Sequence, residues 1–462
     1  MDEILNLDAT DQLLLLKTKK ISARELMIAT LDRINSINPT VNAIIAQRDP
    51  DILIKEADNS LAGPLAGLPI AIKDLEETKD AITSFGSPLF KDFKPTHDST
   101  MVQKLKDAGA IIIGKTNVPE FGLGSNTYNP VYGKTLNPYN LSKSAGGSSG
   151  GAAVALATRM LALADGSDMM GSLRNPAAWN NVYGFRPSFG LVPASKEKES
   201  FFTQLSTKGP MARSIRDLEL LLSIQTAFDA KDPHSNGPYI KSNKSIGNLK
   251  IGWIADWGGA YKTDPKILEL CEKALKKFEK LGHNVIKIDP PFSATALWKS
   301  WTTLRSWSIL GTYRSLYEDA SSKALLKPAV IWEVESALGR SADDIFRASE
   351  VRSEWFRKTA ESEVDIMALP SAQIFPFDSE TDWPKEVLGT KMDTYHRWME
   401  VVIPASLTGL PALSVPVGFG PENTPIGMQL FGHRRKDAII LALAKQYEIE
   451  ISFTSQKPDL QK

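Results

Sequence analysis

The apolar positions near the start of the chain recur every three or four residues, which is the spacing of an amphipathic helix. An apolar stripe runs from Met27 to Ile34, and a Ser-x-x-Glu capping box begins at Ser22. We expect this helix to end before Pro39, because proline has no N–H to donate to the preceding turn. The first sixty residues are therefore predicted to form helical scaffold.

Beyond residue 63 the pattern changes to short apolar runs separated by Gly, Pro and polar stretches. A helix-like segment, MVQKLKDAG, lies between the first two runs, and such alternation of strand and helix is typical of α/β folds. A second amphipathic helix begins at Pro265 and is ended by Gly282, with Cys271 on its apolar face. The predicted strands are 68–72, 110–113, 249–255, 410–419 and 427–432.

Tryptophan is concentrated in one part of the chain, since seven of the ten tryptophans lie between residues 290 and 400. We find no internal repeat, and no change of composition marks a flexible linker. The sequence therefore favours one large α/β domain, 1–462, with 290–400 as a helical insertion or flank. This segment could line a substrate cleft, but the helical spacing of Leu297, Trp301 and Leu304 favours core packing.

Composition excludes several classes of protein. Hydrophobic residues make up 42% and charged residues 23% of the 462 residues, as in ordinary globular domains. Fifty-four Lys and Arg balance fifty-four Asp and Glu, so no overall field attracts nucleic acid or an anionic membrane. A single cysteine excludes a disulfide framework and fits a reducing compartment. With no signal-peptide pattern and no apolar run near the ~20 residues of a membrane span, we expect a cytoplasmic protein.

Two patterns that would suggest other chemistry fail on physical grounds. GAIIIGKT at 109–116 matches the string of a phosphate-binding loop, but its middle residues are better explained as a β-strand than as a loop of exposed N–H groups. The five histidines show no metal-ligand spacing, and no Gly-x-Ser-x-Gly elbow accompanies them. We expect each histidine to lie in a loop or at the surface.

Two runs of small residues are the strongest candidates for chemistry, GGSSGG at 146–151 and DGSDMMGSLRNPA at 165–177. Taken alone, such runs are more often flexible loops. Here the apolar segment AAVALATRMLALA, predicted to be a helix, separates them, so both turns are expected inside the fold. A serine on a buried glycine turn has backbone N–H groups beside it that can stabilise an oxyanion.

Lys73 is the candidate base for such a serine, because it directly follows the apolar strand LPIAI. In isolation, a lysine at a strand end is more often an ordinary solvated side chain. To act as a base at pH 7 its pKa must fall from about 10.4 to about 7, at a free-energy cost of about 4 kcal/mol. Burial at the end of the strand could produce this decrease.

Three segments together resemble the motifs of the amidase signature family: GLPIAIKDL at 67–75, GGSSGGAAVALA at 146–157 and GSDMMGSLRNPA at 166–177. Further segments resemble family landmarks in the same order, so the likeness is strong over residues 60–220 and looser elsewhere. The resemblance implies a central mixed β-sheet flanked by helices, in an enzyme that hydrolyses carboxylic amides. The stretch DMMGSLRNPAAWNN looks closest to bacterial aryl-acylamide and nylon-oligomer hydrolases.

The family pattern implies roles for three residues of this chain. Ser172 would be the nucleophile, Ser148 would relay its proton from a position after a cis peptide, and Lys73 would be the neutral base. Twenty-four residues separate the two serines, which matches the family's spacing. An acyl-enzyme would follow, with neither a metal nor an organic cofactor. The resemblance assigns the oxyanion to the backbone N–H groups of Met169, Met170, Gly171 and Ser172.

The chain departs from the family at one position, since it has Met170 where relatives usually have glycine. If that position needs a positive φ, methionine is strained there by about 1–2 kcal/mol and full activity is in doubt. Otherwise Met170 only narrows the acyl pocket, which is the interpretation we favour. Asp168 and Arg174 flank the nucleophile, and we expect them to form an ion pair that braces the loop.

The sequence leaves the substrate open among small-molecule amides. Asn126 lies in a loop where relatives line the cleft, and we expect a hydrogen bond from it to the substrate. A loop-structuring role for the same asparagine is nearly as well supported. We expect no nucleic acid or membrane partner, and the oligomeric state stays open, with a homodimer as one option.

Two other functions compete with that of an amidase. The A subunit of a tRNA-dependent amidotransferase would use the same three residues to release ammonia from glutamine. Those subunits typically have Glu-Asn-Ser where this chain has Tyr128-Asn129-Pro130, and Lys-Pro-Thr near Arg186-Pro187-Ser188. The alternative of another class is a catalytically impaired binding protein on the same scaffold, which Met170 suggests.

Overall fold

The computed structural model describes residues 2–59, 62–194, 199–241 and 246–460. Its main feature is an eight-stranded sheet with the order β10-β9-β11-β15-β14-β7-β8-β6. β10, β9 and β11 run parallel and the other neighbours pair antiparallel, so the sheet is mixed, as the resemblance implied. The strands are β6 (Leu163–Asp168), β7 (Tyr183–Arg186), β8 (Thr207–Ala212), β9 (Lys250–Trp253), β10 (Asn284–Lys287), β11 (Ile366–Pro370), β14 (Ala412–Phe419) and β15 (Pro425–Gly432).

A smaller three-stranded sheet contains the strand that ends in Lys73. In it β2 (Pro69–Lys73) runs parallel to β3 (Ile111–Thr116), and β1 (Ile44–Ile45) pairs antiparallel with β3. β2 also packs beside β6 of the main sheet. Because Lys73 is the last residue of β2 and Asp168 the last of β6, the ends of two strands meet at one place.

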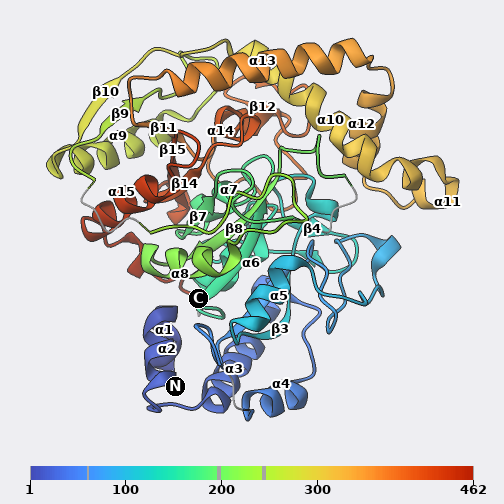
Figure 1. Cartoon of the computed structure of the whole chain (residues 1–462), viewed down its shortest axis with the longest axis vertical. Helices are drawn as coiled ribbons and strands as arrows, with labels where there is room; N and C mark the ends of the chain where they lie inside the picture. Colours follow the sequence, from blue (N-terminus) through green and yellow to red (C-terminus); the bar gives the residue numbers. More distant parts are fainter. Residues whose placement is uncertain (1, 60–61, 195–198, 242–245, 461–462) are drawn as a thin grey trace.

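Helices surround the sheets. Figure 1 shows the N-terminal helices at one end of the molecule and α10, α12 and α13, from the tryptophan-rich segment, at the opposite end. No helix within the described ranges is long and apolar enough to cross a membrane. The helices are α1 (Asp2–Asn6), α2 (Ala9–Lys17), α3 (Ala23–Val41), α4 (Pro50–Ala57), α5 (Thr100–Asp107), α6 (Gly150–Ala157), α7 (Arg174–Trp179), α8 (Ile215–Gln225), α9 (Pro265–Lys280), α10 (Ala294–Glu318), α11 (Ala320–Lys323), α12 (Pro328–Leu338), α13 (Ala342–Ala360), α14 (Ile403–Leu407) and α15 (Asp437–Ile449).

The amphipathic pattern of the first sixty residues forms α3, with both hydrogen bonds of the capping box present at Ser22. The expected end before Pro39 is wrong, because the helix continues to Val41. The Asn38 side chain accepts the Ala43 N–H at 2.9 Å, which holds the turn that contains the proline. This bond fixes the chain just after the helix ends.

The five predicted strands are all present, with small shifts at their ends. The segment GAIIIGKT forms β3, which confirms that it is a strand and not a phosphate-binding loop. The single helix expected for AAVALATRMLALA is wrong, because α6 ends at Ala157 and β6 begins at Leu163. The chain leaves the helix through Arg159, whose left-handed φ of 62° ends α6.

The residues that the helical spacing predicted to be buried lie in the core. Leu297 and Trp301 are fully buried on α10, and Cys271 is fully buried on α9. The expectation that each histidine lies in a loop or at the surface is confirmed, although the loop positions of His283 and His396 are buried. His283 pairs with the backbone and a glutamine, whereas His396 borders the cavity described below.

Candidate active site

Lys73 lies at the end of β2 with its side chain fully buried. Its Nζ atom is 2.9 Å from Ser148 Oγ, 2.8 Å from Ser149 Oγ and 3.0 Å from Ser167 Oγ. The Ser167 carbonyl oxygen lies 3.2 Å away. All four neighbours are neutral oxygens, so the amine can lose its proton and accept a hydrogen bond from a hydroxyl group.

Burial lowers the pKa of Lys73 from 10.5 to about 7, and the negative charges of Asp165, Asp168 and Glu76 limit the decrease. A large share of the molecules therefore holds Lys73 as a neutral amine at neutral pH. A general base is most effective when its pKa lies near the working pH. Lys73 has this property because the fold removes it from water.

Asp165 supports Lys73 from the neighbouring strand. Its Oδ1 atom accepts the Lys73 backbone N–H at 2.9 Å, which ties the end of β2 to β6. Burial raises the pKa of Asp165 to about 6. The Asp165 carboxylate therefore acts on the lysine in two ways, through the strand position and through its charge.

The turn that carries Ser148 is buried and held by side chains, and is not a flexible loop. The Gly147–Ser148 peptide bond is cis, and Ser125 Oγ donates to the Gly147 carbonyl at 3.0 Å. α6 begins at Gly150, where a Cβ atom would lie 2.3 Å from Thr127 Oγ1. Only glycine fits at this position, so the glycine run permits close packing of the turn.

Ser172 lies in the turn between β6 and α7, which the Asp168 carboxylate organises. Asp168 accepts the N–H groups of Gly171 at 2.8 Å and Leu173 at 3.2 Å. Arg174 donates two hydrogen bonds of 3.0 Å to the same carboxylate. Burial alone would raise the pKa of Asp168, but the guanidinium groups beside it hold the pKa well below its usual range. The expected ion pair that braces the loop is confirmed.

The left-handed residue of this turn is Gly171, with a φ of 78°, and Met170 lies outside the left-handed region. A Cβ atom at Gly171 would also come within 3.0 Å of the Val402 methyl carbons. The strain considered for Met170 is therefore absent. Its buried side chain packs in the core and lines the cavity that contains Ser172.

The N–H groups expected to hold an oxyanion are not equivalent. The Gly171 N–H donates to Asp168 Oδ1 at 2.8 Å, and the role of the four N–H groups at an oxyanion stays a prediction. Within the described ranges, the N–H groups of Met169, Met170 and Ser172 have no acceptor in the protein. These three donors remain candidates for the oxyanion.

Ser148 and Ser172 line the same cavity. The Ser149 N–H donates to the Ser172 carbonyl at 3.2 Å, which holds the two turns together. The Lys73–Ser148 contact is formed, but no hydrogen bond between the Ser148 and Ser172 hydroxyl groups is present among the described residues. The Ser172 hydroxyl is thus free to meet a ligand in the cavity.

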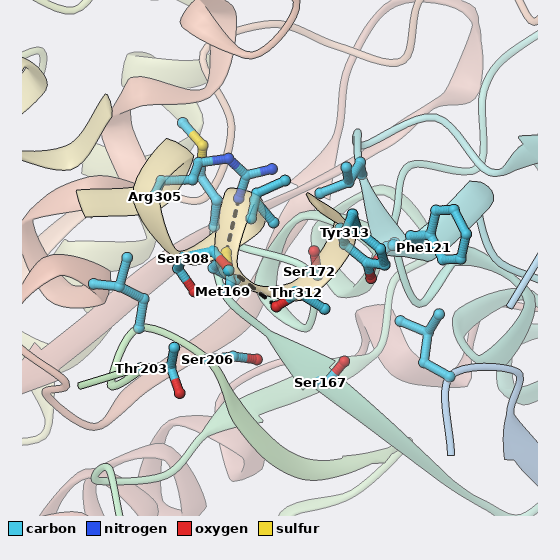
Figure 2. Close-up of a pocket in the computed structure, with 18 of the residues that line it drawn as sticks. Phe121, Ser167, Met169, Ser172, Thr203, Ser206, Arg305, Ser308, Thr312 and Tyr313 are labelled. Atoms are coloured by element: carbon cyan, nitrogen blue, oxygen red, sulfur yellow. Dashed lines mark hydrogen bonds between the residues drawn. The ribbon is translucent and has the colours of Figure 1, made fainter. Parts of the chain in front are cut away.

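The cavity has a volume of about 1070 Å³. One wall is aromatic and includes Phe121 and Tyr313, whose ring centroids are 4.5 Å apart. Figure 2 shows Ser172 between these rings on one side and the Met169 and Arg305 side chains on the other. The site therefore has an apolar side and a polar side around the serine.

Asn126 lies elsewhere than expected. Its side-chain nitrogen donates to the Thr381 carbonyl at 2.9 Å, and its oxygen accepts from Ser144 Oγ at 2.7 Å. It borders a separate, smaller pocket and does not line the cavity that contains Ser172. Asn126 thus structures its loop, and its contact with a substrate stays a prediction.

Sequence reasoning missed four polar residues of the site: Ser149, Ser167, Arg305 and His396. Ser149 and Ser167 stand within the two small-residue runs and could have been included on that ground. Arg305 and His396 are far from both runs in the sequence, and no local pattern distinguishes them. Only the packing of α10 and of the chain before Trp398 against the turn of Ser172 reveals them.

Comparisons with known proteins show which family the chain resembles along its length. The amidase family model matches residues 25–441. An acylamidase of Rhodococcus erythropolis is 29% identical over 98% of this chain and 97% of its own length. The A subunit of the glutamyl-tRNA(Gln) amidotransferase of Thermosynechococcus vestitus is 32% identical over 96% of this chain and 97% of its own length.

Solved structures give the same result. A bacterial aryl acylamidase superimposes with a TM-score of 0.90 at 27% identity, covering 98% of this chain and 99% of its own. A 6-aminohexanoate cyclic dimer hydrolase, at 24% identity and a TM-score of 0.85, shares the fold over 99% of this chain and all of its own. The chain therefore belongs to the amidase signature family, and it is an enzyme of the amide-hydrolysing kind that its sequence motifs resembled.

Proposed function

We propose that this enzyme hydrolyses the C–N bond of a small, non-peptide carboxylic amide through an acyl-enzyme on Ser172. The observation that carries the proposal is the 2.9 Å contact between the buried Lys73 Nζ and Ser148 Oγ, since Ser148 and Ser172 line the same cavity. The lowered pKa of Lys73 supports its role as the base. Ser148 lies between the base and the cavity, which supports its role as proton relay.

In the first step the substrate brings the Ser172 hydroxyl within reach of Ser148, since catalytic hydrogen bonds often close only in the substrate complex. Ser172 Oγ forms a bond to the amide carbonyl carbon. Its proton passes to Ser148 Oγ while the Ser148 proton passes to Lys73 Nζ. The carbonyl oxygen becomes an oxyanion, which the N–H groups of Met169, Met170 and Ser172 stabilise.

In the second step the oxyanion reforms the carbonyl and the C–N bond breaks. The leaving nitrogen takes a proton from Lys73 by way of Ser148 and departs as an amine. Water then attacks the ester carbon on Ser172 and gives its proton to Lys73 along the same path. Breakage of the ester bond returns the proton to Ser172 and releases the carboxylic acid.

The substrate class is supported by the walls of the cavity and by the relatives. Aromatic side chains line one side of the cavity, and aromatic walls favour apolar acyl or aryl groups. The acylamidase and the aryl acylamidase carry amide substrates in their names. We therefore propose an aryl or alkyl amide, linear or cyclic, as the substrate.

The test is hydrolysis of four compounds: an aryl anilide, a short aliphatic amide, a cyclic amide and glutamine. Wild type, Ser172→Ala and Lys73→Ala are compared, with Ser223→Ala on the exposed face of α8 as a matched control. We expect cleavage of at least one of the first three compounds, lost by orders of magnitude in the first two variants and kept in the control. Cleavage that persists in Ser172→Ala would overturn the proposal.

A second candidate function is that of the A subunit of an amidotransferase. Relatives of that description are 31–33% identical over almost the whole chain, and this observation favours it. The same site would then release ammonia from glutamine. Cleavage of glutamine alone in the four-compound test would favour this candidate over the amidase. The alternative of a catalytically impaired binding protein rested on strain at Met170, and Met170 is free of backbone strain.

A further inference from the structure

Arg305 borders the cavity of Ser172 and is held there by three contacts. It lies on α10 and is 3% exposed. Its Nε atom donates to Glu333 Oε1 at 2.6 Å, and Nη2 donates to the Tyr395 hydroxyl at 2.8 Å. Nη1 donates to the Met169 sulfur at 3.0 Å, a contact drawn in Figure 2. The guanidinium is therefore fixed beside Met169, the first residue of the turn that carries Ser172.

The contact with Met169 leaves Arg305 with unused donor capacity. Nη1 carries two N–H groups, and in the part of the chain that the structure describes its only acceptor is a thioether. A thioether sulfur is a weak acceptor compared with an oxygen. A buried donor without a strong acceptor is unfavourable unless a ligand supplies one. The cavity beside Arg305 is where such a ligand would lie.

His396 gives an independent observation at the same end of the cavity. The side chain is buried, it lines the cavity, and neither Nδ1 nor Nε2 has a hydrogen-bond partner among the described residues. Its ring lies 5.1 Å from that of Trp298 and 4.5 Å from that of Tyr395, measured between centroids. Burial lowers the pKa of His396 to about 3, so the ring is neutral. A neutral imidazole offers one donor and one acceptor.

At the end of the cavity formed by Arg305, Tyr395 and His396, the positive charge of Arg305 is balanced by Glu333. Glu333 is buried and pairs with Arg305, and it also accepts from Ser306 Oγ at 2.9 Å. Tyr395 and His396 are neutral. A carboxylate placed here would add an unbalanced negative charge, whose burial is costly. A neutral oxygen acceptor, such as a carbonyl, meets the need of Nη1 without that cost.

We propose that Arg305 and His396 form a recognition subsite for a second neutral carbonyl oxygen, so that the preferred substrates are amides that carry another carbonyl group. This inference rests on the proposed function of the cavity. The second carbonyl accepts from Arg305 Nη1 in place of the Met169 sulfur. The scissile carbonyl lies at Ser172, and Met169 joins the two positions.

The test measures binding in the Ser172→Ala background, so that it does not depend on turnover. The probes are a series of N-phenyl alkanamides that carry a ketone at successive positions of the acyl chain, each paired with the plain alkyl analogue. We expect one ketone position to bind about 10- to 100-fold tighter than its analogue, the range for a hydrogen bond to a charged group. Equal binding of every pair would overturn the subsite.

Variants then assign the preference to Arg305. Arg305→Gln combined with Glu333→Gln removes both charges, so no buried charge is left alone, and we expect the ketone preference to fall toward unity. Lys299→Gln, an exposed charge on the same helix, is the control and keeps the preference. An equal loss of affinity for both members of a pair would indicate a purely structural role for Arg305 and contradict the proposal.

Met169→Leu gives a second test that leaves the ion pair of Arg305 intact. Leucine removes the sulfur acceptor but keeps an apolar side chain of similar size, so we expect the ketone preference to be kept or increased. Loss of the preference in this variant would overturn the proposal. Failure of amide hydrolysis with an intact ketone preference would instead refute the proposed function alone, since binding is measured without Ser172.

Discussion

Replacement of Lys73 by methionine tests whether burial sets the protonation of the base. The variant keeps a side chain of similar length but has no titratable group. The pKa of Lys73 is 10.5 in the unfolded chain and about 7 in the fold. The lowered pKa means that protonated Lys73 destabilises the fold. Below pH 7 it lowers the free energy of unfolding by about 5 kcal/mol, at about 1.4 kcal/mol for each unit of the pKa difference.

The sign of the pH dependence follows from the lowered pKa. Between pH 7 and pH 10.5 the unfolded chain binds a proton at Lys73 that the folded chain does not hold, so stability rises with pH. Because the titration is half complete at pH 7, we expect wild type to gain about 2 kcal/mol relative to Lys73→Met between pH 7 and pH 9. Other titrating groups are common to both proteins and cancel in this difference.

The assay is urea denaturation of both proteins at pH 7 and pH 9. Lys73→Met also removes a donor from Ser148, Ser149 and Ser167, but this loss is independent of pH and does not enter the comparison. Lys299→Met, at the exposed surface of α10, is the matched control and is expected to show no such change. A stability difference between Lys73→Met and wild type that is the same at both pH values would refute the argument.

Three further predictions address the surroundings of the base and the nucleophile. We expect kcat/KM to rise with pH as Lys73 loses its proton near pH 7. Asp165→Asn should move this rise to lower pH, because the carboxylate raises the pKa of Lys73. A pH-rate profile checks this, and a move of the rise to higher pH would contradict it. Gly171→Ala should lower the free energy of unfolding by about 1–3 kcal/mol, because φ is 78° and Val402 is close; an unchanged denaturation midpoint would count against the strain. Arg174→Met should lower the free energy of unfolding by about 3–5 kcal/mol, because Asp168 stays buried with one guanidinium fewer beside it. A decrease below about 1 kcal/mol in urea denaturation would show that the loop does not need the Asp168–Arg174 ion pair.

Local patterns were sufficient for much of the fold. Strands such as β3 and β15 and the helix α9 follow directly from apolar runs and periodicity, because each pattern is contained in a short segment. The division between α6 and β6 could not be predicted, since apolar residues stand on both sides of Thr158 and Arg159 and have no period that separates helix from strand. There the left-handed Arg159, set by tertiary packing, decided the outcome.

The site was predictable where sequence motifs carry it and unpredictable where the fold assembles it. Lys73, Ser148 and Ser172 stand in recognisable segments; the two serines line one cavity, and Lys73 contacts Ser148 from behind it. The engagement of the Gly171 N–H by Asp168 depends on turn geometry that composition does not reveal. Arg305 comes from a helix far along the chain, and its position beside Met169 is a property of tertiary structure alone.

The most direct test of the central claim is intact-mass spectrometry of the enzyme quenched during turnover of an activated aryl ester and of an aryl anilide. The account predicts an added mass equal to the acyl group less one hydrogen, mapped by peptide digestion to Ser172 and absent from Ser172→Ala. Slower decay of the adduct is expected in Lys73→Ala, because deacylation needs the same base. An adduct on another residue, or product formation in Ser172→Ala at the wild-type rate, would contradict the account.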